Sequence, residues 1–461
     1  MMNKDQLLNQ LQQLRSYHQT GITQPVDFRK QQLKKLKQAV LEHEEDLYAA
    51  LYTDLKKSKE ECWVTEIGFL LSELNATLKH LDKWIKAKRV KTNLLNLPSK
   101  SYIMPEPLGV VLIIGPWNYP LQLLFTPLVG AIAAGNCVVL KPSEFASATS
   151  KVMKQIIEKI FSPEYILYVE GDGAETVPMM MNNFRFDHVF YTGSTVVGNL
   201  VYKMAAEKLV PVTLELGGKS PCVIEADVNI KVAAKRIALT KFSNAGQMCV
   251  APDYILVHHS IKEKFLIALK ESLLNFFGEN PEESYNYGRI INEKQFDRLI
   301  NYLQQGNIVH GGKTNRDNLF IEPTIMENVS VDAALMRDEI FGPIVPLFGF
   351  DSKEEAKQII NQNADPLAFY VFTSSLEREQ WWLQNIPAGG TCVNNASWHL
   401  TNHHLPFGGR GNSGIGKYHG RFSFDTFSHQ KAVLKTPTWF DPAIKYPPFK
   451  GKLNLFKKVL R

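Results

Sequence analysis

The sequence predicts an α/β protein built on doubly wound parallel sheets, and two observations carry this prediction. Short apolar runs alternate with segments of helical periodicity, and this alternation occurs twice along the chain. The runs are 110-VVLII, 137-CVVL, 165-YILYV, 188-HVFY and 211-PVTLEL in the first set, then 254-YILV, 307-NIVHGG, 344-IVPLFGF and 368-AFYVFT in the second. These runs are also continuously apolar, as is typical of parallel strands that helices cover on both faces. Ligands of such sheets bind at the carboxyl ends of the strands.

The composition is that of an ordinary globular protein. A chain of 461 residues is long enough for two or three domains, each with its own core. Hydrophobic residues make up 44% and charged residues 21%, which excludes an intrinsically disordered protein. The formal net charge of +6 is mild for this length. It permits anionic ligands but does not indicate a nucleic-acid partner.

Residues 4–90 are predicted to be helical because their aliphatic residues recur at helical spacing. The repeating residues are Leu33, Leu36, Val40, Leu47 and Leu51, then Ile67, Leu70, Leu71, Leu74, Leu78 and Leu81. The uncharged stretch from Val110 to Leu140 has the length of a membrane span, but prolines and asparagines interrupt it. We expect a buried strand, turn, helix and strand there. The basic segment 448-PFKGKLNLFKKVLR-461 has the pattern of an amphipathic helix.

The cysteines indicate a reducing compartment. They are an odd number and are scattered without a CxxC pair, at Cys62, Cys137, Cys222, Cys249 and Cys392. This spacing argues against a disulfide framework or a zinc ribbon. The N-terminal residues lack the apolar core of a signal peptide, so we expect a cytoplasmic protein.

A glycine turn after the fourth strand is a candidate phosphate-binding site. In 191-YTGSTVVG-198 a strand ends at Gly193 and a helix opens at Thr195, where backbone N–H groups suit a pyrophosphate. The turn does not match the GxGxxG fingerprint, and a purely structural glycine turn is an equally open interpretation.

Two other patterns are rejected. The segment 217-GGKS-220 imitates a Walker loop, but Thr213 stands where that loop requires glycine. The histidines at 399, 403 and 404 have no HExxH spacing and no acidic partner nearby. We therefore expect solvated imidazoles and no metal site.

Three residues are candidates for catalysis. Cys249 lies in 242-FSNAGQMCVAPDYILV-257 after a polar run, where a nucleophilic thiolate would find N–H donors and room for a substrate. Glu215 lies in an otherwise apolar strand, where burial would raise its pKa toward that of a general base. Asn118 in 115-GPWNYP-120 follows a strand and could stabilise an oxyanion. The alternatives are a small buried cysteine, a salt-bridged glutamate and a turn asparagine.

Five ordered motifs together resemble the aldehyde dehydrogenase family. They are GPWNYP, VTLELGGKSP, FSNAGQMCVAPDYILV, DEIFGPIVP and LPFGGRGNSGIGKYHG. The segments CVAPDY, YHGRFSFDTFSH and KYPP resemble the class 3 branch of this family, which includes fatty-aldehyde enzymes. The likeness extends from about residue 5 to about residue 448.

The resemblance implies roles for the three candidates. Cys249 would attack the aldehyde carbonyl, and Asn118 with the Cys249 backbone N–H would hold the oxyanion. Hydride transfer to a nicotinamide would leave a thioester, which water activated by Glu215 would hydrolyse. The implied substrates are medium- or long-chain aliphatic aldehydes or aromatic aldehydes. The implied product is a carboxylic acid.

The resemblance also implies a dinucleotide cofactor. NAD is expected first and NADP second, because an acidic residue near the adenosine ribose repels the extra phosphate. The residues implied in cofactor binding are Lys141, Glu144, Gly193, Ser194, Gly198, Glu339 and Phe341. Val196 departs from the small residues common in this turn. Trp117, Tyr119, Leu239 and Trp398 are candidate walls of the substrate pocket, each of which could equally be a core residue.

The implied organisation is two Rossmann-like domains joined by a small bridging β segment. We expect the NAD(P)-binding domain at 1–84 and 108–213 and the catalytic domain at 214–397. The bridging and oligomerisation segment comprises 85–107 and 398–432, and the tail is 433–461. A homodimer is implied. We expect Leu453–Leu460 to cover a tunnel mouth, on the same or the partner subunit, or to lay the tail on an anionic membrane.

The same residues disfavour two other functions. A CoA-acylating dehydrogenase is disfavoured because thiolysis does not need the base that Glu215 would supply. A catalytically silent protein on the same scaffold, such as a lens-type crystallin, would be expected to lose at least one of Cys249, Glu215 and Asn118.

Overall fold

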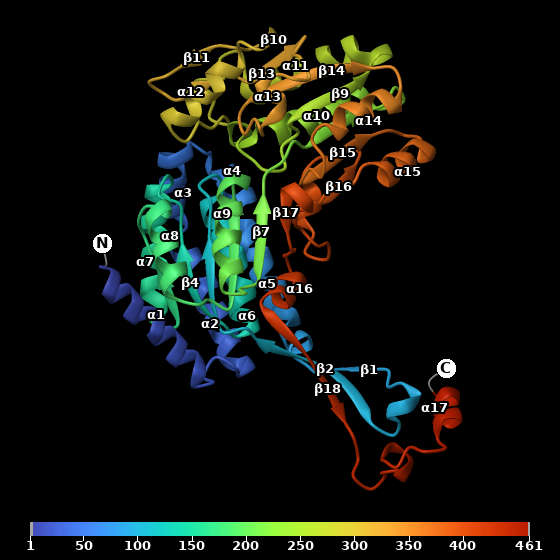
Figure 1. Cartoon of the computed structure of the whole chain (residues 1–461). Helices are drawn as coiled ribbons and strands as arrows, with labels where there is room; N and C mark the ends of the chain where they lie inside the picture. The colour runs from blue at the N-terminus through green and yellow to red at the C-terminus, as the bar shows by residue number, and fades with distance from the viewer. Residues whose placement is uncertain (1–2, 460–461) are drawn as a thin grey trace.

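The computed structural model describes residues 3–459, and it confirms the α/β fold (Figure 1). The predicted helical region contains α1 (Lys4–Gln19), α2 (Val26–Glu42), α3 (Glu44–Leu55), α4 (Lys59–Cys62), a π-helical turn η1 (Trp63–Ile67) and α5 (Gly68–Trp84). Leucines at the predicted spacing, such as Leu33, Leu47 and Leu74, are buried in the core. A π-helical turn is rare and is often found at a functional site.

The first large sheet contains all five strands predicted for the first half of the chain. They are β3 (Val110–Ile114), β4 (Cys137–Lys141), β5 (Ile166–Tyr168), β6 (His188–Gly193) and β7 (Val212–Leu216). These strands are parallel, and a short antiparallel strand, β17 (Gly414–Ile415), completes the order β17-β7-β6-β3-β4-β5. The chain starts at β3 and leaves it in both directions. The crevice of this doubly wound sheet therefore lies at the carboxyl ends of β3 and β6.

The helices of this sheet follow the predicted alternation. They are α6 (Pro120–Ala134), α7 (Ser147–Ile160), α8 (Gly173–Asn183) and α9 (Thr195–Glu207). The uncharged stretch 110–140 forms β3, α6 and β4 and is buried, as predicted. Among residues 3–459, no helix has the length and apolarity needed to cross a bilayer.

The second large sheet has seven strands in the order β10-β13-β14-β9-β8-β15-β16. They are β8 (Pro221–Ile224), β9 (Tyr254–His258), β10 (Asn307–His310), β13 (Thr324–Glu327), β14 (Ile344–Phe350), β15 (Ala368–Phe372) and β16 (Gly390–Val393). The apolar pattern did not identify β8, β13 and β16, which have only four residues each. It also did not predict that β10 is an antiparallel edge strand.

Helices and a small hairpin connect these strands. The helices are α10 (Ile230–Phe242), α11 (Lys262–Phe277), α12 (Glu293–Tyr302), α13 (Ala334–Arg337), α14 (Lys353–Asn361) and α15 (Leu376–Asn385). The hairpin consists of β11 (Thr314–Asn315) and β12 (Phe320–Ile321). Short 3₁₀ turns are η2 (Leu94–Asn96), η3 (Ser243–Gly246), η4 (His259–Ile261), η5 (Trp398–Thr401), η6 (Gly411–Ser413) and η7 (Ala443–Lys445).

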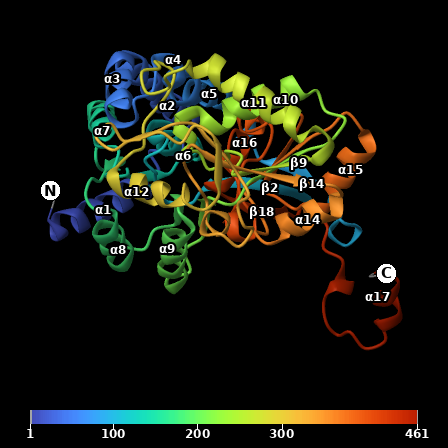
Figure 2. The same cartoon turned by 90° about the horizontal axis from the view of Figure 1, so that it is seen from above.

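A three-stranded antiparallel arm extends away from the two large sheets (Figure 1). Its strands are β1 (Lys88–Val90), β2 (Lys100–Pro107) and β18 (Ser428–Lys435), and α16 (Arg421–Thr426) precedes β18. The tail helix α17 (Leu453–Val459) lies beyond this arm and apart from both large sheets in the two views of the molecule (Figures 1 and 2).

Candidate active site

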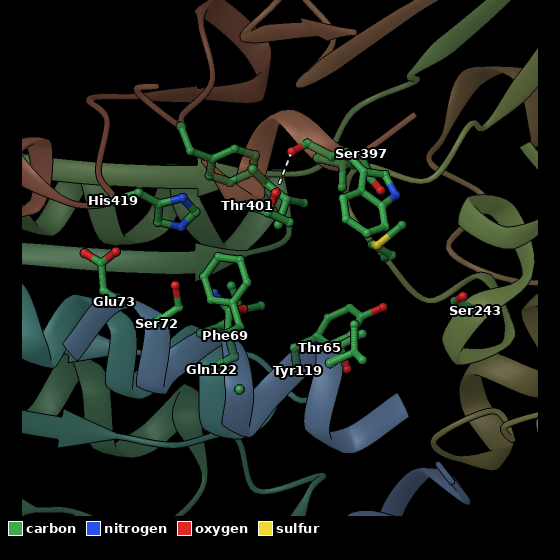
Figure 3. Close-up of a pocket in the computed structure, with 18 of the residues that line it drawn as sticks. Thr65, Phe69, Ser72, Glu73, Tyr119, Gln122, Ser243, Ser397, Thr401 and His419 are labelled. Carbon is green, nitrogen blue, oxygen red and sulfur yellow. Dashed lines mark hydrogen bonds between the residues drawn. The ribbon is translucent and has the colours of Figure 1, made fainter. Parts of the chain in front are cut away.

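A cavity of about 450 Å³ lies among α5, the start of α6, the loop that follows α10 and the segment 397–419. Figure 3 shows its lining residues, with Ser243 toward one end and Glu73 and His419 at the other. Three of the four predicted pocket walls, Tyr119, Leu239 and Trp398, line it. The fourth, Trp117, is not a lining residue of this cavity. Its ring instead packs edge-on against Phe341, with 5.2 Å between ring centroids.

The loop that carries Cys249 has an unusual backbone. Asn244 and Ala245 both have φ of 50°, and Gly246 has φ of +74°. A side chain at 246 would lie 2.2 Å from the carbonyl oxygen of Gly342. Glycine is therefore required for the Cys249 loop to pack directly on the backbone of the segment that follows Glu339 and Phe341.

The polar run before Cys249 holds this loop in place. Asn244 and Gln247 are both fully buried. Gln247 donates from Nε2 to the carbonyls of Asn244 and Arg289, at 3.0 and 2.9 Å, and its Oε1 accepts from Ile291 N–H at 3.0 Å. The polar residues that suggested an open site in the sequence thus form hydrogen bonds with the backbone of the loop.

Cys249 is the one cysteine of the five that is partly exposed, and it lines the cavity. This placement separates it from Cys62, Cys137, Cys222 and Cys392, which are all buried. Its ionisation differs from the expected thiolate. Burial, and then the carboxylates of Glu215 and Glu339, raise the pKa of the Cys249 thiol well above its ordinary value. The sulfur is therefore a thiol at neutral pH.

Glu215 is buried without a partner. It lies in β7 between Thr192 of β6 and Gly414 of β17, and its side chain is only 1% exposed. Neither carboxylate oxygen has a hydrogen-bond partner, and no ion pair in residues 3–459 includes this side chain. Burial raises the pKa of Glu215 to about 7, with smaller opposing effects from Cys249 and Thr192. The alternative of a salt-bridged glutamate therefore does not describe these residues.

Asn118 follows β3 and is connected to the Cys249 loop. Its Nδ2 donates to the carbonyl of Gln247 at 3.1 Å. The backbone carbonyl of Asn118 accepts from Lys57 Nζ at 2.9 Å and from Asn244 Nδ2 at 2.8 Å. Lys57 is itself buried and paired with Glu66 at 2.7 Å. Neither Asn118 nor Glu215 lines the cavity. Asn118 is hydrogen-bonded to the loop that carries Cys249, and Glu215 interacts with the Cys249 side chain.

The predicted phosphate turn has the close packing that a dinucleotide requires. Ser194 caps α9, with its Oγ accepting from the N–H of Val197 at 3.4 Å. A side chain at Gly198 would lie 2.5 Å from Leu216, so glycine allows α9 to pack closely on β7. Val196 is exposed on the first turn of α9. The fit of the turn to a pyrophosphate is thus supported by the N-terminus of a thirteen-residue helix.

The other predicted cofactor residues lie near the carboxyl ends of β4 and β7. Lys141 ends β4, is buried, and donates from Nζ to Glu144 at 3.2 Å. The exposed Glu144 also accepts from the N–H of Gly173 at 3.3 Å. Glu339 lies against Gly217, directly after β7, where a side chain would come within 1.9 Å of its carboxylate. Phe341 has φ of 46°, a backbone strain that is often found at functional sites.

Several lining residues were not predicted. They are Phe69, Ser72 and Glu73 of α5, with Met248, Val250, Tyr418 and His419. The carboxylate of Glu73 on a helix next to leucines 70, 71 and 74 was a signal that could have been used. The histidine prediction was partly wrong. His399 Nδ1 lies 3.2 Å from Cys392 Sγ, and His403 lines the cavity, whereas His404 is exposed. Among residues 3–459, no group of three or more metal-binding side chains is present.

A doubly wound sheet with a glycine turn at its crevice, next to a thiol and a buried carboxyl, places the protein among the dinucleotide-dependent oxidoreductases. The chain belongs to the aldehyde dehydrogenase family, whose model matches residues 12–433. It is an NAD(P)-dependent enzyme that oxidises aldehydes. Solved members of this family include complexes with NAD⁺.

Several similar proteins support the class 3 resemblance. The chain is 46% identical to 4,4'-diaponeurosporen-aldehyde dehydrogenase of Staphylococcus aureus over 97% of each chain. It is 42% identical to aldehyde dehydrogenase family 3 member H1 of Arabidopsis thaliana, over 98% of this chain and 94% of that protein. The solved substrate-bound state of Staphylococcus aureus AldH superposes with a TM-score of 0.97 at 45% identity and covers both chains completely.

Proposed function

We propose that this aldehyde dehydrogenase oxidises medium- and long-chain aliphatic aldehydes, and aromatic aldehydes, through a thioester on Cys249. One observation carries the proposal: the only partly exposed cysteine opens onto the cavity beside a buried carboxyl that has no other partner. Such a pairing of a nucleophile and a base in a cavity is the usual sign of covalent catalysis.

The first step forms a bond between Cys249 Sγ and the aldehyde carbon. The resting thiol is protonated, so it releases its proton to solvent water as the sulfur attacks. The carbonyl oxygen becomes an oxyanion, which the second N–H of the Asn118 amide and the N–H of Cys249 stabilise. The hydrogen bond from Asn118 to the Gln247 carbonyl, at 3.1 Å, holds that amide toward the Cys249 loop.

The cofactor residues fit a dinucleotide at the crevice of the first sheet. The N-terminus of α9 with Gly193, Ser194 and Gly198 would hold the pyrophosphate. Lys141 and Glu144 would bind the adenosine ribose, and Glu339 and Phe341 would hold the nicotinamide end. Bound NAD(P)⁺ supplies the hydride acceptor that converts the thiohemiacetal on Cys249 into a thioester. Glu144 favours NAD over NADP, because its carboxylate would face the additional phosphate.

Hydrolysis of the thioester is the role of Glu215. Its carboxylate accepts a proton from water, the hydroxide oxygen bonds to the acyl carbon, and the C–S bond breaks to release the acid. The proton then returns to the sulfur. This base also disfavours the CoA-acylating alternative, since transfer of the acyl group to CoA does not use water.

The preference for apolar substrates is supported by the cavity lining near Cys249. Leu239, Met248, Val250 and Trp398 are apolar lining residues, and the relative from Staphylococcus aureus is named 4,4'-diaponeurosporen-aldehyde dehydrogenase. Apolar lining with a few placed polar groups is the usual composition of such pockets.

The remaining assignments concern assembly and location. We propose the domain boundaries given by the sequence, with a homodimer formed through the arm of β1, β2 and β18. The tail would cover the partner's cavity or lie on an anionic membrane, because its large apolar residues are exposed among lysines: Trp439 is 78% exposed, and Phe449 and Leu453 are 51% and 61% exposed. Five free thiols favour the cytoplasm.

The proposal is tested with Cys249→Ala in an assay of NADH formation from hexanal. We expect turnover to fall by at least about a thousandfold, because the nucleophile is absent, while NAD binding measured by fluorescence titration is retained. Cys222→Ala is the matched control, since Cys222 lies in the core of the second sheet, and it should keep its activity. Substantial turnover by Cys249→Ala would contradict the nucleophile assignment.

A further inference from the structure

One end of the cavity carries a carboxyl and an imidazole. Ser72 and Glu73 of α5 and His419 gather there, whereas Ser243, at the start of the loop that leads to Cys249, lies toward the other end (Figure 3). The proposed chemistry uses none of these polar groups. Burying the His419 ring without a hydrogen-bond partner is unfavourable, so its presence requires an explanation.

His419 is fixed in position and has free hydrogen-bonding capacity. It is 2% exposed, and neither ring nitrogen has a hydrogen-bond partner in residues 3–459. Its ring stacks on Phe407 at 5.1 Å and meets Phe69 edge-on at 5.4 Å, which holds its orientation. Burial lowers the pKa of His419 to about 3, an effect that the nearby Leu400 backbone opposes only in part. The imidazole is therefore neutral and offers one N–H and one acceptor nitrogen.

Glu73 is the second polar group at this end. It is 3% exposed and accepts from the N–H of Gly420 at 2.6 Å, directly after His419 in the chain. Burial raises its pKa to about 7. Among the ion pairs of the described chain, none includes Glu73. A carboxyl with no nearby cation favours a neutral ligand group or a cationic one, and it repels an anion.

We propose that Glu73 and His419 form a subsite for a hydroxyl group at the end of the substrate remote from its aldehyde. A hydroxyl donates one hydrogen bond and accepts others, which matches a neutral imidazole and a carboxyl in one small space. This inference rests on the proposed function, because the aldehyde itself must lie at Cys249. The predicted substrate class is therefore apolar aldehydes with a terminal hydroxyl.

The test compares straight-chain aldehydes of increasing length in matched pairs. In each pair a terminal hydroxyl replaces a terminal methyl, so that size is nearly constant. At one chain length kcat/KM should favour the hydroxyl member by about tenfold, the factor of one to two neutral hydrogen bonds. At shorter lengths the preference should be absent, because the hydroxyl does not reach the subsite.

Two variants and a control assign that preference to the subsite. His419→Phe keeps a ring between Phe407 and Phe69 but removes both nitrogens, so the tenfold preference should disappear while the methyl series is retained. Glu73→Gln keeps a donor and an acceptor and should retain the preference within about threefold. His259→Phe, at an exposed position of η4, should match the unchanged protein.

The outcomes separate this inference from the proposed function. Equal rates for both members of every pair would overturn the hydroxyl subsite while leaving aldehyde oxidation intact. A stronger preference for terminal amines would also overturn it, since a cation would then be the ligand of Glu73. No turnover with any aldehyde would overturn both proposals. If His419→Phe does not fold, the length profile of the unchanged protein decides.

Discussion

At Cys249 and Glu215, burial sets the protonation of both groups. The same low-polarity surroundings raise the pKa of the thiol well above its ordinary value and that of the carboxyl to about 7. The site therefore holds a protonated thiol beside a carboxyl that can act as a base near neutral pH. Because the two groups interact, a titration would report apparent pKa values that belong to the pair.

Replacing Glu215 by Gln tests the assignment of the base. Hydrolysis should slow by about 10²–10⁴-fold, the usual contribution of a general base. The first hydride transfer should be affected less, so stopped-flow mixing should show a full-size burst of NADH followed by slow turnover. Loss of the NADH burst would instead mean that Glu215 is needed before the hydride transfer, which would contradict its assignment to hydrolysis.

The pH profile gives the control for this variant. A carboxyl with a raised pKa accepts a proton only above that value, so hydrolysis should accelerate as the pH rises through about 7 and then level off. Glu215→Gln should lack this limb. A limb that persists unchanged in the variant would mean that another group titrates.

At the scale of elements, the position of Cys249 depends on how its loop packs on the segment 341–343. Gly246 lets its backbone meet that of Gly342, and Asn244, Ala245 and Phe341 all have positive φ beside this contact. Strain of this kind persists only where surrounding packing enforces it. The buried hydrogen bonds of Gln247 and Asn244 provide that enforcement.

Two alanine substitutions separate backbone strain from this contact. Gly246 and Gly278 have nearly equal φ, +74° and +76°, but a side chain at 278 would meet nothing within 4 Å. Gly278→Ala should destabilise by about 1–3 kcal/mol through conformation alone, because its φ of 76° and ψ of −172° are almost exclusive to glycine. Gly246→Ala should cost at least about 3 kcal/mol, because its methyl overlaps the Gly342 carbonyl.

Thermal unfolding and kcat measure the two effects. Gly278→Ala should keep its activity, whereas Gly246→Ala should lose both thermal stability and turnover as Cys249 moves from Asn118. Equal losses in the two variants would show that the close packing at Gly342 contributes nothing.

Helix α5 shows what periodicity can and cannot predict. Its core face, with Leu70, Leu71 and Leu74, follows directly from the 3.6-residue repeat. The neighbouring Phe69 and Glu73 line the cavity, which no repeat within one helix can reveal, because the opposite wall comes from residues 397–419. Trp117 shows the same limit for a loop residue. It was a candidate wall of the substrate pocket, but its ring packs on Phe341.

At the scale of the whole molecule, the arm and tail concern assembly. The tail helix lies apart from both large sheets (Figures 1 and 2), so within one chain it is remote from the cavity. Coverage of a tunnel mouth would therefore need a partner subunit. The predicted segment extends to Leu460, which lies outside the described residues, as does the side chain of Val459.

Deleting residues 449–461 tests this role. If the tail covers the partner's cavity, the ratio of kcat/KM for hexanal to that for benzaldehyde should fall by about threefold or more, since apolar contact with long chains is lost. Light scattering should give twice the mass of the chain for the full-length and the truncated protein. An unchanged ratio in a dimer would exclude coverage, and binding of the intact protein to anionic vesicles would then decide the membrane alternative.

The sequence by itself determined the α/β class, the five strands of the first sheet and the motifs around Cys249, Glu215 and Asn118. These features depend on local periodicity and on short segments, which a sequence states directly. Tertiary structure alone decided the raised pKa of Cys249, the missing partner of Glu215 and the polar end of the cavity. Burial and electrostatics depend on segments such as 66–73, 215–217 and 397–419, which are far apart in the chain and meet only in the fold.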